Sequence, residues 1–205
     1  MRKIQLCCIC LITFFSAFAQ SPKDSAALAR RDSLRMAKMF GSAIYPLIKE
    51  APMGGVVEIP NPDEKPDPKM KYKLLMNFVQ PATTPAKAKE INGALAEVAR
   101  IINLHVAAGV PKDHIEVMVI AHGSGLFSLL NDAYYQKKFH INNPNAKLVK
   151  ELQDAGIRFS SCGQAMKFLE IEKEQLLPGI RLAYSAKTVI STYTLKGFLL
   201  TDVND

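Results

Sequence analysis

The stretch NNPNAKLVKELQDAGIRFSSCGQAM, residues 142–166, contains the pattern that decides the fold. Leu148 and Leu152 are four residues apart and therefore share one face of a helix, which Pro144 can start and Gly156 can end. The segment IRFSSC that follows has the alternating apolar residues of a strand, and a further helical piece comes directly after it. Helix, strand and helix in immediate succession indicate an α/β protein.

The same alternation extends on both sides of this stretch. Five strand-like runs are separated by helical segments, which predicts a parallel sheet with helices on both faces. The expected strands are residues 72–80, 114–123, 157–162, 180–185 and 198–203, and the expected helices are residues 84–109, 124–139, 142–156, 163–171 and 186–197, with a short helical piece at 173–177.

Residues 1–19 have the layout of a secretory signal peptide. Arg2 and Lys3 precede an apolar run, and a small-x-small ending predicts cleavage after Ala19. A membrane anchor is the alternative, but the run is shorter than the ~20 apolar residues that a bilayer-spanning helix needs, and no second transmembrane run follows. Cleavage removes three of the four cysteines and leaves Cys162 alone in an exported chain.

Residues 20–71 are expected to form a helical leader and a proline-rich linker. Residues 23–40 have the pattern of a short helix, and their weak segregation of polar and apolar side chains favours a solvated helix over one bound to an anionic membrane surface. Four prolines in residues 59–71 exclude helix and central strand there. The compact domain is therefore predicted for residues 72–205.

The charge distribution argues against nucleic-acid binding. Loss of two basic residues with the signal segment lowers the formal net charge from +7 to +5. Residues 51–205 hold eighteen basic and sixteen acidic residues, which leaves a charge of only +2. Since nucleic-acid binding needs basic residues concentrated on one face, we predict no nucleic-acid partner.

Cys162 stands where a strand ends and a helix begins. Chemistry in parallel sheets gathers at the carboxyl ends of the strands, and helix amide groups favour a thiolate over a thiol. Ser161, Gly163 and Gln164 surround the cysteine with small or polar groups that suit a binding site. Free cysteines are also among the most buried residues, and an unpaired one can form an intermolecular bridge. The sequence leaves a reactive thiol, an inert buried thiol and an intermolecular bridge open.

His122 ends the second expected strand, so the topology places it at the same sheet edge as Cys162. It can orient a ligand or act as an acid or base, and a packed, hydrogen-bonded histidine is an equally good interpretation. Gly123 is a candidate binding residue, although the phosphate-loop and dinucleotide-binding spacings are absent around it. No histidine or cysteine pair has metal-ligand spacing, and no GxSxG nucleophile motif occurs. We therefore predict no metal and no cofactor.

Three segments in order resemble the DsrE/DsrF-like proteins, the superfamily that includes the sulfur-relay subunit TusD. They are VMVIAHGSGLFSLL (117–130), the stretch 142–166 quoted above, and LLPGIRLAYSAKTVISTYTLKGFLL (176–200). The resemblance covers roughly residues 72–201. It implies a three-layer α/β/α fold with a five-stranded parallel sheet and, in active members, a cysteine after the third strand that carries sulfur as a persulfide. Cys162 matches that position.

The resemblance and the predicted signal segment together lead to the hypothesis of an exported DsrE-like protein in which Cys162 accepts sulfane sulfur from a small donor and passes it to an acceptor. His122 would then orient or protonate the leaving group. Characterised relay members are cytoplasmic, whereas this chain is predicted to be periplasmic or secreted. The alternative is a non-catalytic oligomeric binding module in which Cys162 is buried and inert.

A homo-oligomer, a trimer or hexamer, is the expected assembly. The family resemblance is the main reason for this expectation. Val189, Ile190, Tyr193 and Phe198 add more apolar surface than one sheet face obviously needs. The same four residues can instead complete the core of the single chain.

Overall fold

The computed structural model describes residues 22–81 and 84–204, which divide into two compact units between Lys38 and Met39. Most of α1 (Pro22–Gly41) makes up the first unit, as the helical pattern of residues 23–40 predicted. The predicted signal segment lies outside the described residues. None of the helices in the part of the chain that the structure describes combines the length and hydrophobicity of a membrane span.

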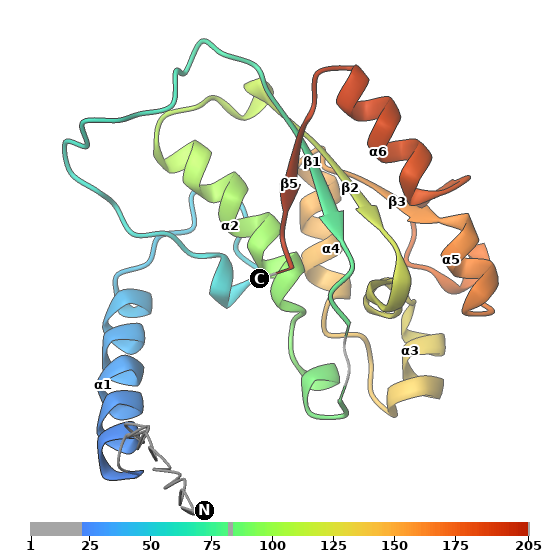
Figure 1. Ribbon diagram of the computed structural model, residues 1–205, viewed down its shortest axis with the longest axis horizontal. Helices are drawn as coiled ribbons and strands as arrows, with labels where there is room; N and C mark the ends of the chain where they lie inside the picture. The colour runs from blue at the N-terminus through green and yellow to red at the C-terminus, as the bar shows by residue number, and fades with distance from the viewer. Residues whose placement is uncertain (1–21, 82–83, 205) are drawn as a thin grey trace, which may run out of the picture. The chain divides into compact units, whose positions relative to one another are not determined.

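A five-stranded sheet forms the centre of the second unit (Figure 1). Its strands are β1 (Tyr72–Phe78), β2 (Ile115–Ala121), β3 (Arg158–Cys162), β4 (Arg181–Ala183) and β5 (Leu199–Asp202). They are ordered β4-β3-β2-β1-β5, and every neighbouring pair is parallel. The α/β fold class predicted from the sequence, with its five-stranded parallel sheet, is therefore confirmed.

The order of the strands places the helices on the two faces of the sheet. From β1 to β4 the chain steps across the sheet in one direction, and then it returns past the whole sheet to β5. Because such crossovers are right-handed, the return helix lies on the opposite face from the others, and Figure 1 shows α2 and α6 on opposite sides of the strands. The helices are α2 (Gly93–Ala107), α3 (Asp132–Phe139), α4 (Ala146–Asp154), α5 (Gly163–Phe168) and α6 (Ala186–Leu195).

The two faces bury different sets of side chains. Alternate residues of each strand point to opposite faces, and the larger apolar cluster lies on the side of α2 to α5. It takes Leu74, Met76 and Phe78 from β1 and Phe159 from β3. The smaller cluster lies under α6 and comprises Leu75, Met118, Ile120, Cys162, Ala186 and Phe198. We call these the main core and the α6 core.

The prediction of a single helix over residues 124–139 is wrong, because the helix is interrupted in the middle of this range. A 3-10 segment, Gly123–Leu129, is followed by a break before α3 begins. Leu130 pairs with Leu176 in an isolated bridge, and the backbone amide of Asn131 donates to the carbonyl of Gln175 at 2.8 Å. The Asn131 side chain then caps α3. These contacts with a distant segment, which the local sequence does not encode, interrupt the helix.

The packed part of the chain begins well before Tyr72, the expected start of the compact domain. The Asn103 side chain on α2 accepts hydrogen bonds from the backbone amides of Leu47 and Ile48 at 3.1 and 2.9 Å. Its amide group donates to the carbonyls of Ile48 and Gly54 at 2.8 and 2.9 Å. Ile48 is fully buried in the main core. Part of the segment expected to be leader and linker therefore belongs to the folded domain.

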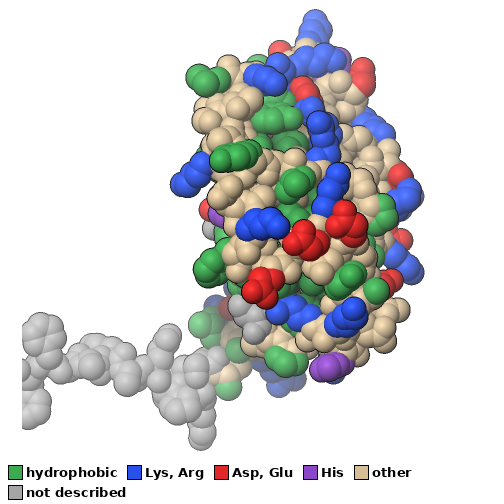
Figure 2. Space-filling view, turned by 90° about the vertical axis from the view of Figure 1, so that its right-hand side faces the viewer, with side chains coloured by type: hydrophobic (Ala, Val, Ile, Leu, Met, Phe, Trp, Pro, Cys, Tyr) green, Lys and Arg blue, Asp and Glu red, His purple; other side chains and the backbone are tan. Residues whose placement is uncertain are grey.

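The apolar residues in and just after α6 that suggested an oligomer interface pack against the α6 core. Phe198 is buried, and Val189, Ile190 and Tyr193 are half-buried against the α6 core. The alternative interpretation, that they complete the core, accounts for them. Exposed apolar side chains remain on this side of the molecule, where Figure 2 shows them scattered among basic side chains and a few acidic ones. The most exposed of them near α6 is Leu195, with 89% of its surface accessible.

Candidate functional site

Cys162 and His122 lie next to each other on the α6 face of the sheet. The register pairs Ala121 with Ser161, so the next position along places His122 beside Cys162. The His122 amide donates to the Phe78 carbonyl at 3.0 Å, which continues the strand ladder through this residue. Adjacent strands are about 4.8 Å apart, so the two side chains start at that spacing. The sequence predicted this shared edge, and the structure places both residues there.

The imidazole of His122 is bound by a neighbour that the sequence reasoning missed. Its Nε2 lies 2.8 Å from Oδ1 of Asn77, which lies near the end of β1. Asn77 is two residues after Leu75, a member of the α6 core, and therefore faces the same side. A polar residue inside the apolar run YKLLMNF was the available signal. Asn77, His122 and Cys162 thus lie on three adjacent strands, in that order.

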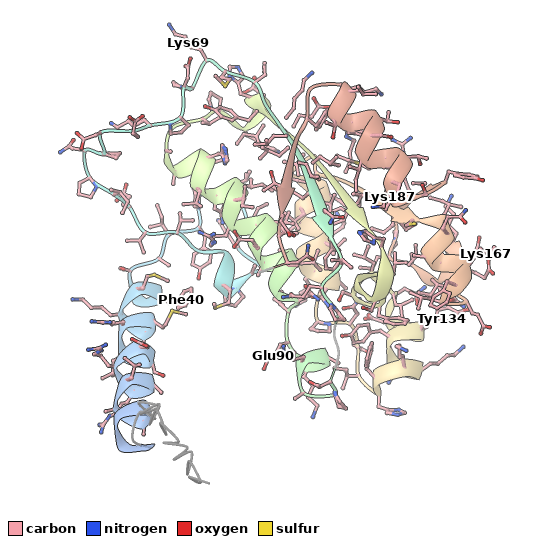
Figure 3. All side chains as sticks on the ribbon, viewed as in Figure 1. Phe40, Lys69, Glu90, Tyr134, Lys167 and Lys187 are labelled. Carbon is pink, nitrogen blue, oxygen red and sulfur yellow. The ribbon has the colours of Figure 1, made fainter. Side chains whose placement is uncertain are left out.

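The surroundings of His122 favour its neutral form. Burial lowers the pKa of His122 below its usual value, and the positive charge of Lys187 lowers it further. Lys187 lies in the first turn of α6 (Figure 3). A neutral imidazole can accept a proton, so His122 is suited to act as a base near neutral pH.

The thiol of Cys162 lies in an apolar setting close to two helix starts. Only 6% of the residue is exposed, and it belongs to the α6 core. It immediately precedes α5, while Ala186, the first residue of α6, is in the same cluster. The partial positive charge of helix amide groups stabilises a thiolate, whereas apolar burial destabilises one. The site is therefore compatible with a reactive thiol and with an inert one.

Gly163 has a packing role. A Cβ atom at this position would lie 2.8 Å from the carbonyl oxygen of Ala183 and 3.3 Å from that of Tyr184. Only a residue without a side chain lets the start of α5 approach the end of β4 this closely. Gln164 is exposed, and its amide is 3.5 Å from the Tyr184 carbonyl. Both predicted binding residues thus join α5 to β4.

Ser161 and Gly123 also have structural roles, one through a hydrogen bond and the other through its backbone conformation. Ser161 is fully buried and lies two residues after Phe159, so it faces the main core, away from Cys162. Its hydroxyl donates to the Arg181 carbonyl at 3.2 Å. Gly123 has a φ of +55°, a left-handed conformation that turns the chain out of β2 after His122. Of the six residues predicted for the site, the structure brings together Cys162 and His122.

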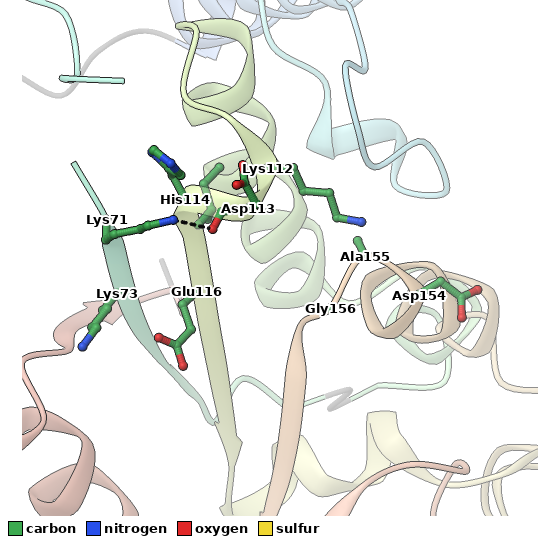
Figure 4. Close-up of a pocket in the computed structure, with 10 residues that line it drawn as sticks. Lys71, Lys73, Lys112, Asp113, His114, Glu116, Asp154, Ala155 and Gly156 are labelled. Atoms are coloured by element: carbon green, nitrogen blue, oxygen red, sulfur yellow. Dashed lines mark hydrogen bonds between the residues drawn. The ribbon is translucent and has the colours of Figure 1, made fainter. Parts of the chain in front are cut away.

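Two hollows of the surface bear on the site, and the second is lined by Gly163 and Gln164, the residues that follow Cys162 in the sequence. One of about 650 Å³ is at the amino edge of the sheet, lined by Lys71, Lys73, Lys112 and acidic residues (Figure 4). Another of about 430 Å³ lies between α5 and the end of β4, where Leu182 shares the main-core face of the sheet with Ser161. Neither is lined by Cys162. Within residues 22–81 and 84–204, no group of three potential metal ligands occurs.

Comparison with known proteins identifies the family. The model of the DsrE/DsrF-like family matches residues 73–201, a range that includes Asn77, His122 and Cys162. No curated protein matches the chain. A solved structure described as a protein of unknown function, MTH1491 from Methanobacterium thermoautotrophicum, is similar with 17% identity and a TM-score of 0.48, covering 64% of this chain and 98% of that one. Because the family match spans more than half of the sequence, this protein belongs to the DsrE/DsrF-like family.

Proposed function

We propose that this protein is an exported sulfur carrier that holds sulfane sulfur as a persulfide on Cys162. Membership of the DsrE/DsrF-like family supports sulfur relay as the general class. The observation that carries the finer proposal is the position of Cys162 beside a histidine whose pKa is lowered by burial and by Lys187, which favours the neutral imidazole. The predicted signal segment supports export, and the mass of the chain recovered from its native compartment should correspond to residues 20–205.

The transfer needs a thiolate, a base and a small donor. His122 takes the proton of the Cys162 thiol, and the thiolate attacks the outer sulfur of an organic persulfide, R–S–SH. A new S–S bond forms on Cys162, the old S–S bond breaks, and its electron pair leaves with R–S⁻. The imidazolium then protonates R–S⁻, so that thiol and persulfide exchange one sulfur atom and His122 returns to its neutral form.

Intact-mass measurement tests the proposal. Protein lacking residues 1–19 has a single cysteine, so any added sulfur is assigned without ambiguity. After treatment with an organic persulfide, the wild type should gain one sulfur atom that a reductant removes, while Cys162→Ser gains none. His122→Asn keeps the thiol and should load more slowly. Equal gain in wild type and Cys162→Ser would overturn the proposal.

A binding or assembly module with an inert cysteine is the second candidate. The observation that favours it is the burial of Cys162 within the α6 core. A neutral alkylating agent separates the two functions, because a carrier thiol reacts in the folded protein. If modification appears only when urea unfolds the chain, the module is the better description.

The assembly is proposed to be a homo-oligomer, a trimer or hexamer, as the family resemblance implies. Leu195 and Leu199, which are 89% and 66% exposed, mark the end of α6 and the edge strand β5 as candidate contact surface. Light scattering should give a mass of three or six chains. A folded monomer at micromolar concentration would remove this part of the proposal.

A further inference from the structure

We infer that Asn77 is a positioning residue for His122: it holds the imidazole with a proton on Nε2 and so leaves the Nδ1 lone pair free to take the proton of the Cys162 thiol. This inference rests on the proposed function, because it specifies how the base of that site is prepared. It assigns a role to a residue on β1, the strand next to the one that leads to His122.

The chemistry of the contact fixes the position of the proton. The amide oxygen of Asn77 can only accept a hydrogen bond, so Nε2 of His122, at 2.8 Å, must donate. A neutral imidazole carries a single ring proton, which this contact places on Nε2. The remaining nitrogen, Nδ1, therefore has the lone pair. An imidazole without such a partner would exchange between its two tautomers, and only one of them leaves Nδ1 as the base.

The backbone around Asn77 is held on both sides. Asn77 is paired in register with Ile120 of β2 and with Asp202 of β5. The side chain of Asn204 donates to the Asn77 carbonyl at 2.8 Å and accepts from the backbone amides of Val79 and Gln80, at 2.8 and 2.9 Å. These hydrogen bonds fix the backbone at Asn77, and the fixed backbone keeps the Asn77 side chain within reach of the imidazole. Positioning of this kind needs such a rigid support.

Two charged side chains lie near the pair and have to be considered in any pH profile. Lys187 on α6 lowers the pKa of His122. Asp202, at the end of β5, is the register partner of Asn77. Its carboxylate accepts hydrogen bonds from the side chain and backbone of Asn204, and these bonds lower the pKa of Asp202. The hydrogen-bond partner of His122 itself, Asn77, is uncharged. A carboxylate in its place would stabilise the protonated imidazolium, which cannot accept a proton from the thiol.

The tautomer can be read without any reaction. In ¹⁵N spectra, the His122 signals, assigned by comparison with His122→Gln, should show a protonated Nε2 in the wild type. In Asn77→Ala they should move toward a mixture of tautomers, whereas Ser185→Ala, which alters another hydrogen bond on the same side of the sheet, leaves them unchanged. A wild-type imidazole protonated on Nδ1, or unchanged signals in Asn77→Ala, would overturn the inference.

Thiol reactivity tests the consequence. Asn77→Ala should slow alkylation of Cys162 roughly tenfold, part of the contribution that a positioned base makes. In a His122→Ala background the same change should have no further effect, since Asn77 acts through His122. In Asn77→Asp the added carboxylate should raise the pKa of His122, so the midpoint of the alkylation rate plotted against pH should move to higher pH. Equal slowing in both backgrounds would assign Asn77 a merely structural role, and thermal melting of each variant verifies the fold.

The two sets of measurements separate this inference from the proposed function. If the tautomer depends on Asn77 but no sulfur is loaded on Cys162, the positioning stands and the carrier function fails. If sulfur is loaded equally fast in Asn77→Ala and wild type, the carrier function stands and the positioning fails.

Discussion

On one face of the sheet, the helices α2 to α5 enclose the main core together with Ile48 from the segment before β1. On the other face, α6 covers a six-residue cluster, and Asn77, His122 and Cys162 lie at the carboxyl ends of the strands. The difference follows from the topology. The successive crossovers from β1 to β4 place several helices on one face, whereas the single crossover that returns to β5 supplies the helix on the other. The main core buries many more apolar side chains than the α6 core, so we expect it to provide most of the stability. The face under α6 holds the polar side chains Asn77 and His122.

Truncation of a main-core aromatic residue should give the largest loss of stability. Phe159 is 1% exposed, so Phe159→Ala should lower the free energy of unfolding by about 3–5 kcal/mol. Val189→Ala on half-buried α6 removes fewer buried atoms and should cost no more than about 1.5 kcal/mol. Urea denaturation of the two variants compares the faces directly. Equal losses would mean that α6 contributes as much to the core as the helices of the opposite face.

Gly163→Ala should give an intermediate loss, at the junction between the two faces. The new methyl group would meet the Ala183 carbonyl oxygen at 2.8 Å, a backbone atom that moves only together with β4. We expect a cost of about 1–3 kcal/mol in urea denaturation. Gly41→Ala is the matched control, since no atom lies within 4 Å of its Cβ position, and it should be neutral or slightly stabilising. A neutral Gly163→Ala would show that α5 and β4 are free to separate.

The sequence predicted the strands well because each is a short apolar run bounded by turn residues. All five runs contain a strand of the sheet, and the carboxyl-edge rule then placed Cys162 and His122 together. Which face of the sheet each side chain points to was harder to predict. In IRFSSC the alternation is clear, but which set faces α6 depends on the return crossover, and so Ser161 was grouped with Cys162 although it points the other way.

Contacts between distant segments were beyond reach of the sequence pattern. Asn103 lies in an apolar helix and binds backbone groups some fifty residues earlier, as the separations of 55 and 56 positions show. No local signal marks Leu47 and Ile48 as its partners, because hydrogen bonds to backbone are independent of the side chain. The Asn77 contact with His122 is of the same kind, spanning 45 positions. Such pairs become visible only when the strands are placed side by side.

The smallest expected effect is the pH dependence that His122 adds to stability. The pKa of His122 is lowered in the folded protein, mainly by burial, whereas in the unfolded chain it should be near 6.5. Above this value both states leave the imidazole neutral, and the residue contributes nothing to pH dependence. As the pH falls below it, the unfolded chain binds the proton first, so the free energy of unfolding decreases until the folded pKa is passed.

His122→Gln removes this titration and keeps a side chain that can donate to Asn77. Urea denaturation at pH 7.5 and pH 5 should therefore show a smaller decrease in the free energy of unfolding for the variant than for the wild type, by a fraction of a kcal/mol because the group is only half-buried. The carboxylates titrate alike in both proteins and cancel in this difference. Parallel pH profiles would mean that the α6 face solvates the imidazolium well, in which case His122 could hold the proton of Cys162 without any cost to the fold.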